Sequence, residues 1–263
     1  MPPIFSFIIV NFKSADMLPL WFASLSNTQL LSNEYEVIIV NNDTAEKNTL
    51  DTLKQQYNFK LIHTESNIGF GSACNLGTKH ALGEILGFIN PDTQFLDGDL
   101  HTLQDQFHSD ASIGVIGLKL LTKQGLVQEW SAGARVTLWD IIRNNLGFPK
   151  SKVLWGSQLP INVDWVSGAS LFISQDLFRS INGFNEDFFL YFEDTDLCER
   201  VRLQGKSILY FPDISLMHIS GASSSSSRKQ KKHYYASQDL YFTKHSPKWE
   251  GWCIKTLRKL FLI

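Results

Sequence analysis

The sequence predicts an α/β protein built around a mostly parallel, doubly wound central sheet. Short apolar runs rich in β-branched residues alternate with helical segments in the first third of the chain. Most of these runs end at Asn and Asp residues, which favour the turns that follow buried strands. With 263 residues, of which 43% are hydrophobic, the chain can bury a sizeable core. These observations together indicate a Rossmann-like sheet covered by helices.

The first third of the chain contains four predicted strands and the helices between them. The strands are short apolar runs bounded by polar turn residues, at residues 5–10, 36–40, 60–63 and 85–89. The helices are expected at residues 17–25, 50–57 and 72–82. Pro19 fits only in the first turn of the first helix, where its missing N–H group is not needed. This alternation is the pattern of parallel strands joined by helical crossovers.

The pattern is less regular in the rest of the chain. Helices are still predicted at residues 99–108 and 175–181, and strands at residues 113–121, 165–173 and 207–211. The segment 128–160 mixes Trp130, Trp139 and Trp155 with Gly and Pro and shows poor periodicity. Long irregular segments of this kind are often functional or act as mobile lids.

The overall charge and the cysteines argue against several classes of protein. A net charge of −2 gives no global attraction to nucleic acid. Cys74, Cys198 and Cys253 are odd in number and far apart, so they form neither a disulfide framework nor a zinc-site spacing, which fits a reducing compartment. The N-terminus lacks the features of a signal peptide, and no segment is apolar for long enough to span a bilayer. We therefore expect a cytoplasmic protein.

Polar residues follow three of the predicted strands. Asn11, the run 41–43 and the run 90–92 each stand directly after an apolar strand. In an open α/β sheet, ligands bind outside the carboxyl ends of the strands, so these side chains are expected to converge on one crevice. Each cluster alone is better explained by the preference of Asn and Asp for turns. Taken together, the three clusters favour the crevice.

An acidic cluster follows an aromatic run. Glu193, Asp194 and Asp196 open a predicted helix directly after the aromatic residues of the segment 188–192. Acidic side chains at a helix N-terminus are stabilised by the free N–H groups there, which explains one of the three. A carboxylate beside other carboxylates and aromatic walls is expected to have a raised pKa, which suits a general base. Both interpretations, helix start and general base, remain open on the residues alone.

Two further features carry little information when they are taken singly. The glycine-rich segment 67–77 begins a helix and allows close backbone approach to a phosphate. It lacks the Lys-Ser/Thr ending of a P-loop and the spacing of the dinucleotide fingerprint. His218 follows a strand, and a lone His in that position is more often a hydrogen-bonded structural residue than a ligand.

The C-terminal region has a different composition. A serine run at 223–227 leads into a basic run at 228–232, as in a solvated loop. Residues 249–263 combine Trp and aliphatic residues with Lys and Arg, which is typical of a helix lying at an anionic membrane surface. A terminal helix packed on the domain explains the same pattern. We expect residues 223–263 to form a basic and aromatic helical tail behind a domain at 1–222.

Several short motifs occur in a specific order and spacing, although each of them is loose alone. They are Ile8-Ile-Val-Asn-Phe12, Asn67-Ile-Gly-Phe-Gly71 with Asn75, Asn90-Pro-Asp92, Gly168-Ala169, Asn182-Gly-Phe184, Tyr191-Phe-Glu-Asp-Thr-Asp-Leu197, His218 and the aromatic-basic segment Tyr234 to His245. Together they resemble the family 2 glycosyltransferases with the GT-A fold, and among these the bacterial rhamnosyltransferase-like branch. The resemblance implies a three-layer α/β/α sandwich, with a nucleotide-sugar half at about 1–98 and an acceptor half at about 99–222.

The resemblance also implies a reaction and a set of site residues. Members of this family move a sugar from a nucleotide diphosphate sugar to an acceptor hydroxyl and invert the anomeric centre. It implies that Asp194 is the general base and that Asp92 and His218 hold Mn²⁺ or Mg²⁺ on the diphosphate. The residues implied for the nucleotide sugar are Asn11, Asn41, Asp43, Asn67, Gly69, Asn75, Asn90 and Asp92. Those implied for the acceptor side are Trp165, Gly168, Ala169 and Glu193.

Two positions depart from the usual pattern of the family. Asn41 stands where members usually carry an Asp that contacts the base, so the preferred base is left open. Asn90 replaces the first acid of the Asp-X-Asp motif, which leaves Asp92 as the carboxylate ligand from that motif. A single carboxylate ligand implies weak affinity for the metal ion.

The branch implies transfer of L-rhamnose from dTDP-L-rhamnose to a hydroxyl of a growing lipid-linked bacterial surface polysaccharide, such as an O-antigen. A UDP sugar is the other expected donor, and a glycan or glycolipid is the expected acceptor. The inner face of the cell membrane is an expected partner, whereas nucleic acid is not.

Two alternatives belong to other classes of protein. A sugar-phosphate nucleotidyltransferase would need a Gly-rich basic loop after the first strand, and the segment 11–14 is not one. A non-catalytic carbohydrate-binding relative would not need Asp92, Asp194 and His218 together. Release of nucleoside diphosphate from the donor would separate an enzyme from such a relative.

Overall fold

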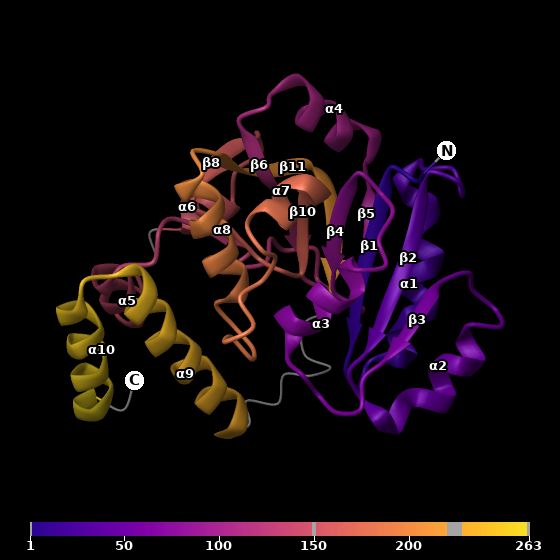
Figure 1. Ribbon diagram of the computed structural model, residues 1–263. Helices are drawn as coiled ribbons and strands as arrows, with labels where there is room; N and C mark the ends of the chain where they lie inside the picture. Colours follow the sequence, from indigo (N-terminus) through magenta and orange to yellow (C-terminus); the bar gives the residue numbers. More distant parts are fainter. Residues whose placement is uncertain (1, 149–150, 220–227, 262–263) are drawn as a thin grey trace.

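The structure is a computed structural model that describes residues 2–148, 151–219 and 228–261 (Figure 1). The strands of its central sheet are β1 (Phe5–Asn11), β2 (Tyr35–Asn41), β3 (Lys60–His63), β4 (Ile85–Ile89), β5 (Thr93–Asp97), β6 (Ile113–Leu121), β8 (Ile161–Val163), β10 (Ser170–Ser174) and β11 (Ser207–His218). A separate pair is formed by β7 (Ala132–Gly133) and β9 (Trp165–Val166). The helices are α1 (Leu18–Ser24), α2 (Lys47–Leu53), α3 (Phe70–Thr78), α4 (His101–Ser109), α5 (Leu138–Asn145), α6 (Lys152–Trp155), α7 (Gln175–Ser180), α8 (Glu193–Leu203), α9 (Arg228–His245) and α10 (Lys248–Phe261).

The central sheet has the strand order β3-β2-β1-β4-β10-β6-β11-β5, with β8 paired to β11. β1, β2, β3, β4, β6 and β11 run in one direction, whereas β5, β8 and β10 run in the opposite direction. The prediction of a mostly parallel, doubly wound sheet is therefore confirmed. Chain order reverses beside β1, because β2 and β3 lie on one side of it and β4 on the other. Ligands bind at such a reversal in open α/β sheets.

Helices cover both faces of the sheet, which confirms the predicted three-layer sandwich. On one face, the apolar cluster contains residues of α1, α2 and α4, represented by Trp21, Leu50 and Leu103. On the other face, α3, α7 and α8 contribute Cys74, Phe178 and other buried residues. Alternate residues of β1 point into the two clusters, as the period of two along a strand requires.

β11 is longer than the sequence predicts. The sequence predicts a strand at 207–211, followed by Pro212, and proline cannot donate a ladder hydrogen bond. In the structure β11 continues to His218, and its register with β6 shifts between Phe211 and Ser215. The proline thus lies at a bulge. After the shift, β11 pairs with β5 and places His218 opposite Thr93.

The predicted strand at 165–173 is divided in two by Ser167 to Ala169. β9 pairs with β7, whereas β10 runs between β4 and β6 in the central sheet. The small residues at this point allow the chain to change from one strand partner to another. Gly168 also comes close to α3, because a Cβ atom added at Gly168 would lie 3.2 Å from the Phe70 ring. The prediction that Gly168 and Ala169 leave room for another group is consistent with this break.

The segment 128–160 is more regular than the sequence indicates, because it contains β7, α5 and α6. Thr137 and Asp140 form a capping box at the start of α5. Leu138 of α5 packs into a third apolar cluster with Phe188, Phe192, Tyr241, Phe242 and Ile254. We call these six residues the C-terminal cluster.

α9 and α10 form the C-terminal part of the described chain. With α5, they gather on the side of the molecule opposite β2, β3 and α2 (Figure 1). The predicted serine run at 223–227 and the boundary at 222/223 lie outside the described residues, so the division into domain and tail stays a prediction. Within the described ranges, no helix combines the length and hydropathy needed to cross a bilayer.

Candidate active site

The polar residues that follow the strands come together at one edge of the sheet. Asn11 and Asn41 end β1 and β2 and lie opposite each other in the parallel register. Asn90 and Asp92 follow β4, and His218 ends β11, whose direction is the same. We call this edge, with Gly168 and Asp194, the strand-end site.

Asn11 and Asn41 are held by hydrogen bonds to each other and to Glu46. The Asn11 amide donates to Asn41 Oδ1 at 3.1 Å and to Glu46 Oε2 at 2.9 Å. Asn41 Oδ1 also accepts from the Asp43 backbone N–H at 3.2 Å. Both Asn side chains are buried, so this network fixes the turns after β1 and β2. Contact of Asn11, Asn41 and Asp43 with a nucleotide stays a prediction.

Asn42 was not among the predicted site residues, yet it organises the glycine-rich loop. Its amide donates to Asn67 Oδ1 at 3.0 Å and to Gly69 O at 3.1 Å. Asn67 Oδ1 in turn accepts from the Gly69 N–H at 2.9 Å. Gly69 has φ of 90°, and an added Cβ atom would lie 2.7 Å from Phe189 O, so glycine is required there. The signal in the sequence was the second Asn of the run 41–43.

Asp92 and His218 form a close pair across β5 and β11. His218 Nε2 lies 3.2 Å from Asp92 Oδ1, and its Nδ1 lies 2.8 Å from Gln128 Oε1. If Nδ1–H donates to Gln128, a neutral imidazole presents the lone pair of Nε2 to the carboxylate, which is also an acceptor. A proton or a cation between the two atoms removes this conflict.

This pair fits a divalent cation. Two ligand atoms that each lie roughly 2.1 Å from one metal ion, with a right angle between them at the ion, are roughly 3 Å apart. The separation of Asp92 Oδ1 and His218 Nε2 is close to this value. A metal-bound His usually donates its other N–H to an oxygen, as His218 can donate to Gln128. No group of three or more His, Cys, Asp or Glu in the described ranges is arranged for a metal ion, so further ligands would come from the substrate and water.

The Asp194 carboxylate is tied to the same edge through the backbone. Asp194 Oδ2 accepts from the Gly168 N–H at 2.9 Å, and the neighbouring Ala169 O accepts from the Asn90 N–H at 3.1 Å. Asp194 remains partly exposed. Burial raises its pKa, and the hydrogen bonds from Gly168 and Thr195 reduce that rise. The Asp194 carboxylate, whose pKa is raised, is thus linked through the backbone of Gly168 and Ala169 to the segment that carries Asn90 and Asp92.

The turn before α8 is strained. Tyr191 and Phe192 both have left-handed backbones, with φ of 69° and 65°, and bulky residues rarely adopt this conformation. The cost is about 1–3 kcal/mol for each residue. Phe192 is held in place by the C-terminal cluster. Among the described residues, no side chain caps α8 from its N-cap position, but Asp194 Oδ1 accepts from the Thr195 N–H of the first turn at 2.7 Å. Acidic stabilisation of the helix start thus accounts for one of the three acids.

Glu193 points into the protein, towards α3. Glu193 is 5% exposed, and its Cβ atom lies 3.7 Å from the site of a Cβ atom at Gly71. Its Oε2 has no hydrogen-bond partner among the residues that the structure describes. Burial, and then the Asp194 carboxylate, raise the pKa of Glu193 well above its usual value. The role of Glu193 at the acceptor stays a prediction. Its buried placement favours a role in positioning the start of α8.

The buried Glu193 is expected to make stability depend on pH. Because the folded protein holds the Glu193 proton more tightly than the unfolded chain, the free energy of unfolding should fall as the pH rises from about 4.3 through the raised pKa. Glu193→Gln should remove this component, and the exposed Glu65→Gln should not. Urea unfolding at several pH values measures it, and equal pH profiles for Glu193→Gln and wild type would contradict the assignment.

Asp196 has a different role from Asp194. It is 1% exposed and forms ion pairs with Arg200 Nε at 2.8 Å and with His245 Nε2 of α9 at 2.7 Å. Burial opposes its ionisation, but His245 and Arg200 outweigh burial, so the pKa of Asp196 is lowered. Asp196 therefore fastens α9 to α8.

Asp196→Asn is expected to destabilise the protein by about 3–5 kcal/mol, because Arg200 loses its buried counter-ion and His245 loses its carboxylate partner. In the wild type, the Asp196 carboxylate should contribute to the free energy of unfolding above about pH 4, and this contribution should be lost as the pH falls. Denaturant unfolding near neutral pH measures the change. A loss below about 1 kcal/mol would show that α9 does not depend on this pair.

Asn75 and Trp165 are both engaged with backbone groups. The Asn75 amide donates to Phe184 O at 2.9 Å, and its Oδ1 accepts from the Phe184 N–H at 2.9 Å. Trp165 Nε1 donates to Ala134 O at 2.9 Å, and its ring covers Gly133. Their predicted contacts with donor and acceptor stay predictions, and the geometry favours structural roles for both.

Trp130 is a residue whose role the sequence left undefined. It is 42% exposed and has a left-handed backbone with φ of 63°. Its loop is fixed on one side by the contact of Gln128 with His218, and on the other by the hydrogen bond from the Ser167 N–H to Ser131 O at 2.9 Å. The backbone of this strained, exposed residue thus connects the residue that contacts His218 with the residue that accepts from Ser167, and its ring packs on Trp155 with the ring centroids 5.2 Å apart.

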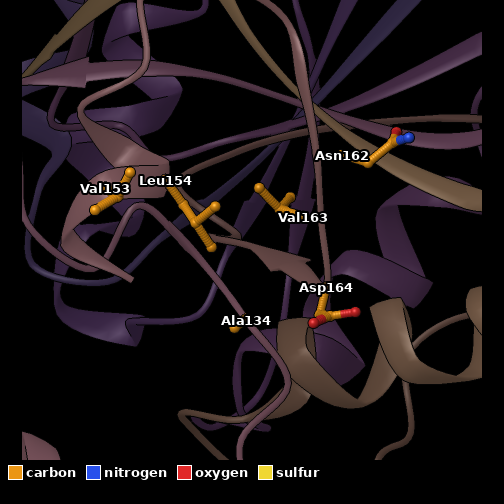
Figure 2. A pocket seen from close by; sticks show the side chains of 6 residues that line it. All are labelled: Ala134, Val153, Leu154, Asn162, Val163 and Asp164. Atoms are coloured by element: carbon orange, nitrogen blue, oxygen red, sulfur yellow. The ribbon is translucent and has the colours of Figure 1, made fainter. Parts of the chain in front are cut away.

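A hollow of about 490 Å³ lies elsewhere, near β8 and α6 (Figure 2). Asp164 is the one titratable side chain among the residues that line it, and its carboxylate is already bound to Arg202 Nη2 at 3.0 Å and to the Arg135 N–H at 2.7 Å. The hollow therefore offers mainly apolar surface, and the one carboxylate that lines it is already paired.

The sequence of this chain is similar to those of named glycosyltransferases. The chain is 25% identical over 242 residues to the N-acetylglucosaminyl-diphospho-decaprenol L-rhamnosyltransferase of Mycobacterium tuberculosis, which covers 83% of this chain and 76% of that protein. It is 25% identical over 203 residues to the rhamnosyltransferase WbbL of Escherichia coli K12, covering 74% of this chain and 76% of WbbL.

Solved structures share the fold at low sequence identity. GalNAc-T7 with UDP, GalNAc and Mn²⁺ superposes with a TM-score of 0.67 at 14% identity, over 92% of this chain and 50% of that one. The mannosyltransferase PcManGT of Pyrobaculum calidifontis, in complex with GDP-Man and Mn²⁺, gives 0.63 at 14% identity, over 93% of this chain and 64% of that one. This chain thus spans about half of GalNAc-T7. These likenesses confirm the GT-A fold.

The family assignment rests on a match that covers more than half of the chain. The family described as "Glycosyl transferase family 2" matches residues 6–177, which contain Asn11, Asp92 and Gly168. The two rhamnosyltransferases named above support the same family and the predicted branch. The chain therefore belongs to glycosyl transferase family 2, as a rhamnosyltransferase-like member with the GT-A fold.

Proposed function

We propose that this protein transfers L-rhamnose from dTDP-L-rhamnose to a hydroxyl of a lipid-linked glycan, with inversion of the anomeric centre. The observation that best supports this proposal is a backbone link. It joins Asp194, through Gly168 and Ala169, to Asn90 and so to the segment of the Asp92–His218 pair. This link supports a site that combines a carboxylate of raised pKa with a pair that fits a cation. The names of the two rhamnosyltransferase relatives support L-rhamnose as the transferred sugar, and the name of the Mycobacterium tuberculosis protein supports a lipid-linked acceptor.

Asp194 is the proposed base of the reaction. The acceptor oxygen attacks the anomeric carbon, and the bond from that carbon to the diphosphate oxygen breaks. The hydroxyl proton passes to Asp194, and the nucleoside diphosphate leaves with the bonding electrons. Attack opposite the leaving group inverts the configuration. The Gly168 N–H holds Asp194 Oδ2 in place, and the raised pKa makes the carboxylate a better proton acceptor than an ordinary Asp.

Asp92 and His218 are the proposed ligands of the cation. When bound, Mn²⁺ or Mg²⁺ offsets the negative charge of the diphosphate. An imidazole ligand suits Mn²⁺ better than Mg²⁺, and the two structural neighbours named above contain Mn²⁺. Gln128 orients the His218 ring by accepting from Nδ1–H.

The nucleotide and sugar of the donor are proposed to bind beside this pair. The turns after β1 and β2 are proposed to receive the base, with Asp43 partly exposed there and Asn11 and Asn41 buried within the turns. Asn67 and Gly69 shape the adjoining loop, whose backbone reaches Phe189 beside α8. The proposed place of Asn90 and Asp92 is between this part and Asp194.

Trp130 is proposed to support the acceptor sugar on its exposed ring face. Trp130→Ala should raise the KM for the acceptor by roughly 2- to 10-fold, because the C–H face of the sugar loses its aromatic contact. The dissociation constant of the donor should not change. Trp139→Ala is the matched control, since Trp139 is an exposed tryptophan of α5. Steady-state kinetics with a soluble acceptor decide, and an unchanged acceptor KM would remove Trp130 from the site.

Thermal unfolding with a panel of nucleotide sugars and Mn²⁺ tests the donor. A ligand at a hundredfold excess over its Kd adds about 2.7 kcal/mol to the free energy of unfolding, so dTDP-L-rhamnose should stand out from UDP and GDP sugars. Release of dTDP must accompany that binding. Binding without release would indicate a non-catalytic relative, and selective stabilisation by another nucleotide sugar would replace the proposed donor.

A further inference from the structure

One face of α10 exposes both aromatic and basic side chains. Trp249 and Trp252 are 55% and 69% exposed. Lys248, Trp252, Lys255 and Lys259 follow one another at the spacing i, i+4, i+7 and i+11, so they form one stripe along the helix. Trp249 lies three residues before Trp252 on the same side.

The opposite face of α10 is used to pack on the protein. Ile254 is 3% exposed and belongs to the C-terminal cluster. Arg258 donates to Gln238 Oε1 at 2.6 Å and to Asp239 Oδ1 at 2.9 Å, and lies over the Tyr235 ring. α10 is therefore fixed through one face, which answers the question that the sequence left open about a packed helix. Its tryptophan and lysine stripe is not needed for that packing.

α5, which packs against α10, has a similar outward stripe. Trp139, Arg143 and Leu146 are spaced i, i+4 and i+7, and all three are exposed. Leu138 and Ile141 of the same helix face the C-terminal cluster. We call the outward stripes of α10 and α5 the tryptophan-lysine surface.

The charge of this region specifies the kind of partner. Residues 228–261 contain nine Lys and Arg residues and two acidic residues, whereas the whole chain has a net charge of −2. Among the residues the structure describes, no acidic side chain forms an ion pair with Lys248, Lys255 or Lys259. Tryptophan side chains favour the headgroup level of a bilayer, and lysines near it are attracted to anionic lipids.

We propose that the tryptophan-lysine surface docks this protein on an anionic lipid bilayer. α10 lies along the surface, with its tryptophans at the headgroup level and its lysines on anionic headgroups. The C-terminal cluster beneath α10 includes Phe188 and Phe192, which directly precede α8. Docking would therefore present the start of α8, with Asp194, beside the membrane. Vesicle binding itself needs neither donor nor acceptor, so it stands or fails separately from the proposed function.

Sedimentation with vesicles tests the proposal. Wild type should bind vesicles of phosphatidylcholine with phosphatidylglycerol, bind pure phosphatidylcholine far more weakly, and dissociate at high salt. Lys248→Gln, Lys255→Gln and Lys259→Gln together should weaken binding on the order of a hundredfold, since each lysine contributes about fivefold. Trp249→Ser with Trp252→Ser should also release the protein, as should Trp139→Ser to a smaller extent.

Point substitutions are better than deletion of α10, because deletion would uncover Ile254 and the C-terminal cluster. The matched control replaces Lys47, Lys54 and Lys79, which are exposed on α2 and after α3, by Gln. It removes the same charge elsewhere and should bind like wild type. Equal loss in the control, or equal binding of wild type to neutral vesicles, would overturn the proposal. Unchanged binding of Trp139→Ser would remove α5 from the surface.

Discussion

Asp194→Asn is expected to lower the rate of sugar transfer by about 10²–10⁴-fold while the protein stays folded and binds donor normally. An amide keeps the shape of the side chain and can still accept a hydrogen bond from the Gly168 N–H. It cannot take the proton of the acceptor hydroxyl. Single-turnover transfer measures the rate, and thermal shift with donor measures binding.

The pH dependence of the same reaction adds a second readout. The base must be ionised, and burial raises the pKa of Asp194. The wild-type rate should therefore begin to fall on acidification at a higher pH than an ordinary Asp would give, and Asp194→Asn should lack this fall. Asp187→Asn is the matched control, because Asp187 precedes the same turn but lies exposed against Lys244. Near-normal turnover by Asp194→Asn would point to another carboxylate, with Glu193 the next candidate.

Asp92→Ala is expected to abolish measurable transfer and to weaken Mn²⁺-dependent nucleotide binding. The substitution removes the carboxylate of the Asp92–His218 pair and leaves one protein ligand. The readout that does not depend on activity is the thermal shift produced by dTDP with and without Mn²⁺. The variant should lose the increment that Mn²⁺ adds, while any shift with dTDP alone should remain.

Two further variants separate a metal site from a structural ion pair. Gln128→Ala should weaken Mn²⁺ binding by about 10- to 100-fold, because Gln128 orients the His218 ring. Asp97→Ala is the control, since Asp97 is an exposed acid at the other end of β5. Full activity of wild type in the presence of a chelator would contradict the assignment of Asp92 and His218 to a cation.

The sequence predicted most of what depends on local pattern. β1 to β4 were predicted within one or two residues, because apolar runs bounded by turn residues specify buried strands directly. The convergence of Asn11, Asn41 and Asn90 on one edge followed from the rule that ligands bind at the carboxyl ends of parallel strands. Asp194 and Asp92 were assigned by resemblance, and their roles stay predictions.

What the sequence could not predict depends on contacts between distant segments. The extension of β11 past Pro212 requires a bulge that only pairing with β5 and β6 defines. Asp196 looked equivalent to Asp194 until His245, which is 49 residues away, was seen beside it. The strain at Trp130 and the placement of Asn75 on the Phe184 backbone likewise arise from tertiary packing.

One measurement tests the central claim most directly. Wild type is incubated with dTDP-L-rhamnose, Mn²⁺ and a lipid-linked or soluble glycan acceptor, and NMR reports the anomeric configuration of the new linkage while dTDP is quantified. We predict one dTDP for each glycoside formed, a configuration opposite to that of the donor, and no product with Asp194→Asn. A linkage that retains the donor configuration, or equal product with Asp194→Asn, would contradict an inverting reaction in which Asp194 is the base.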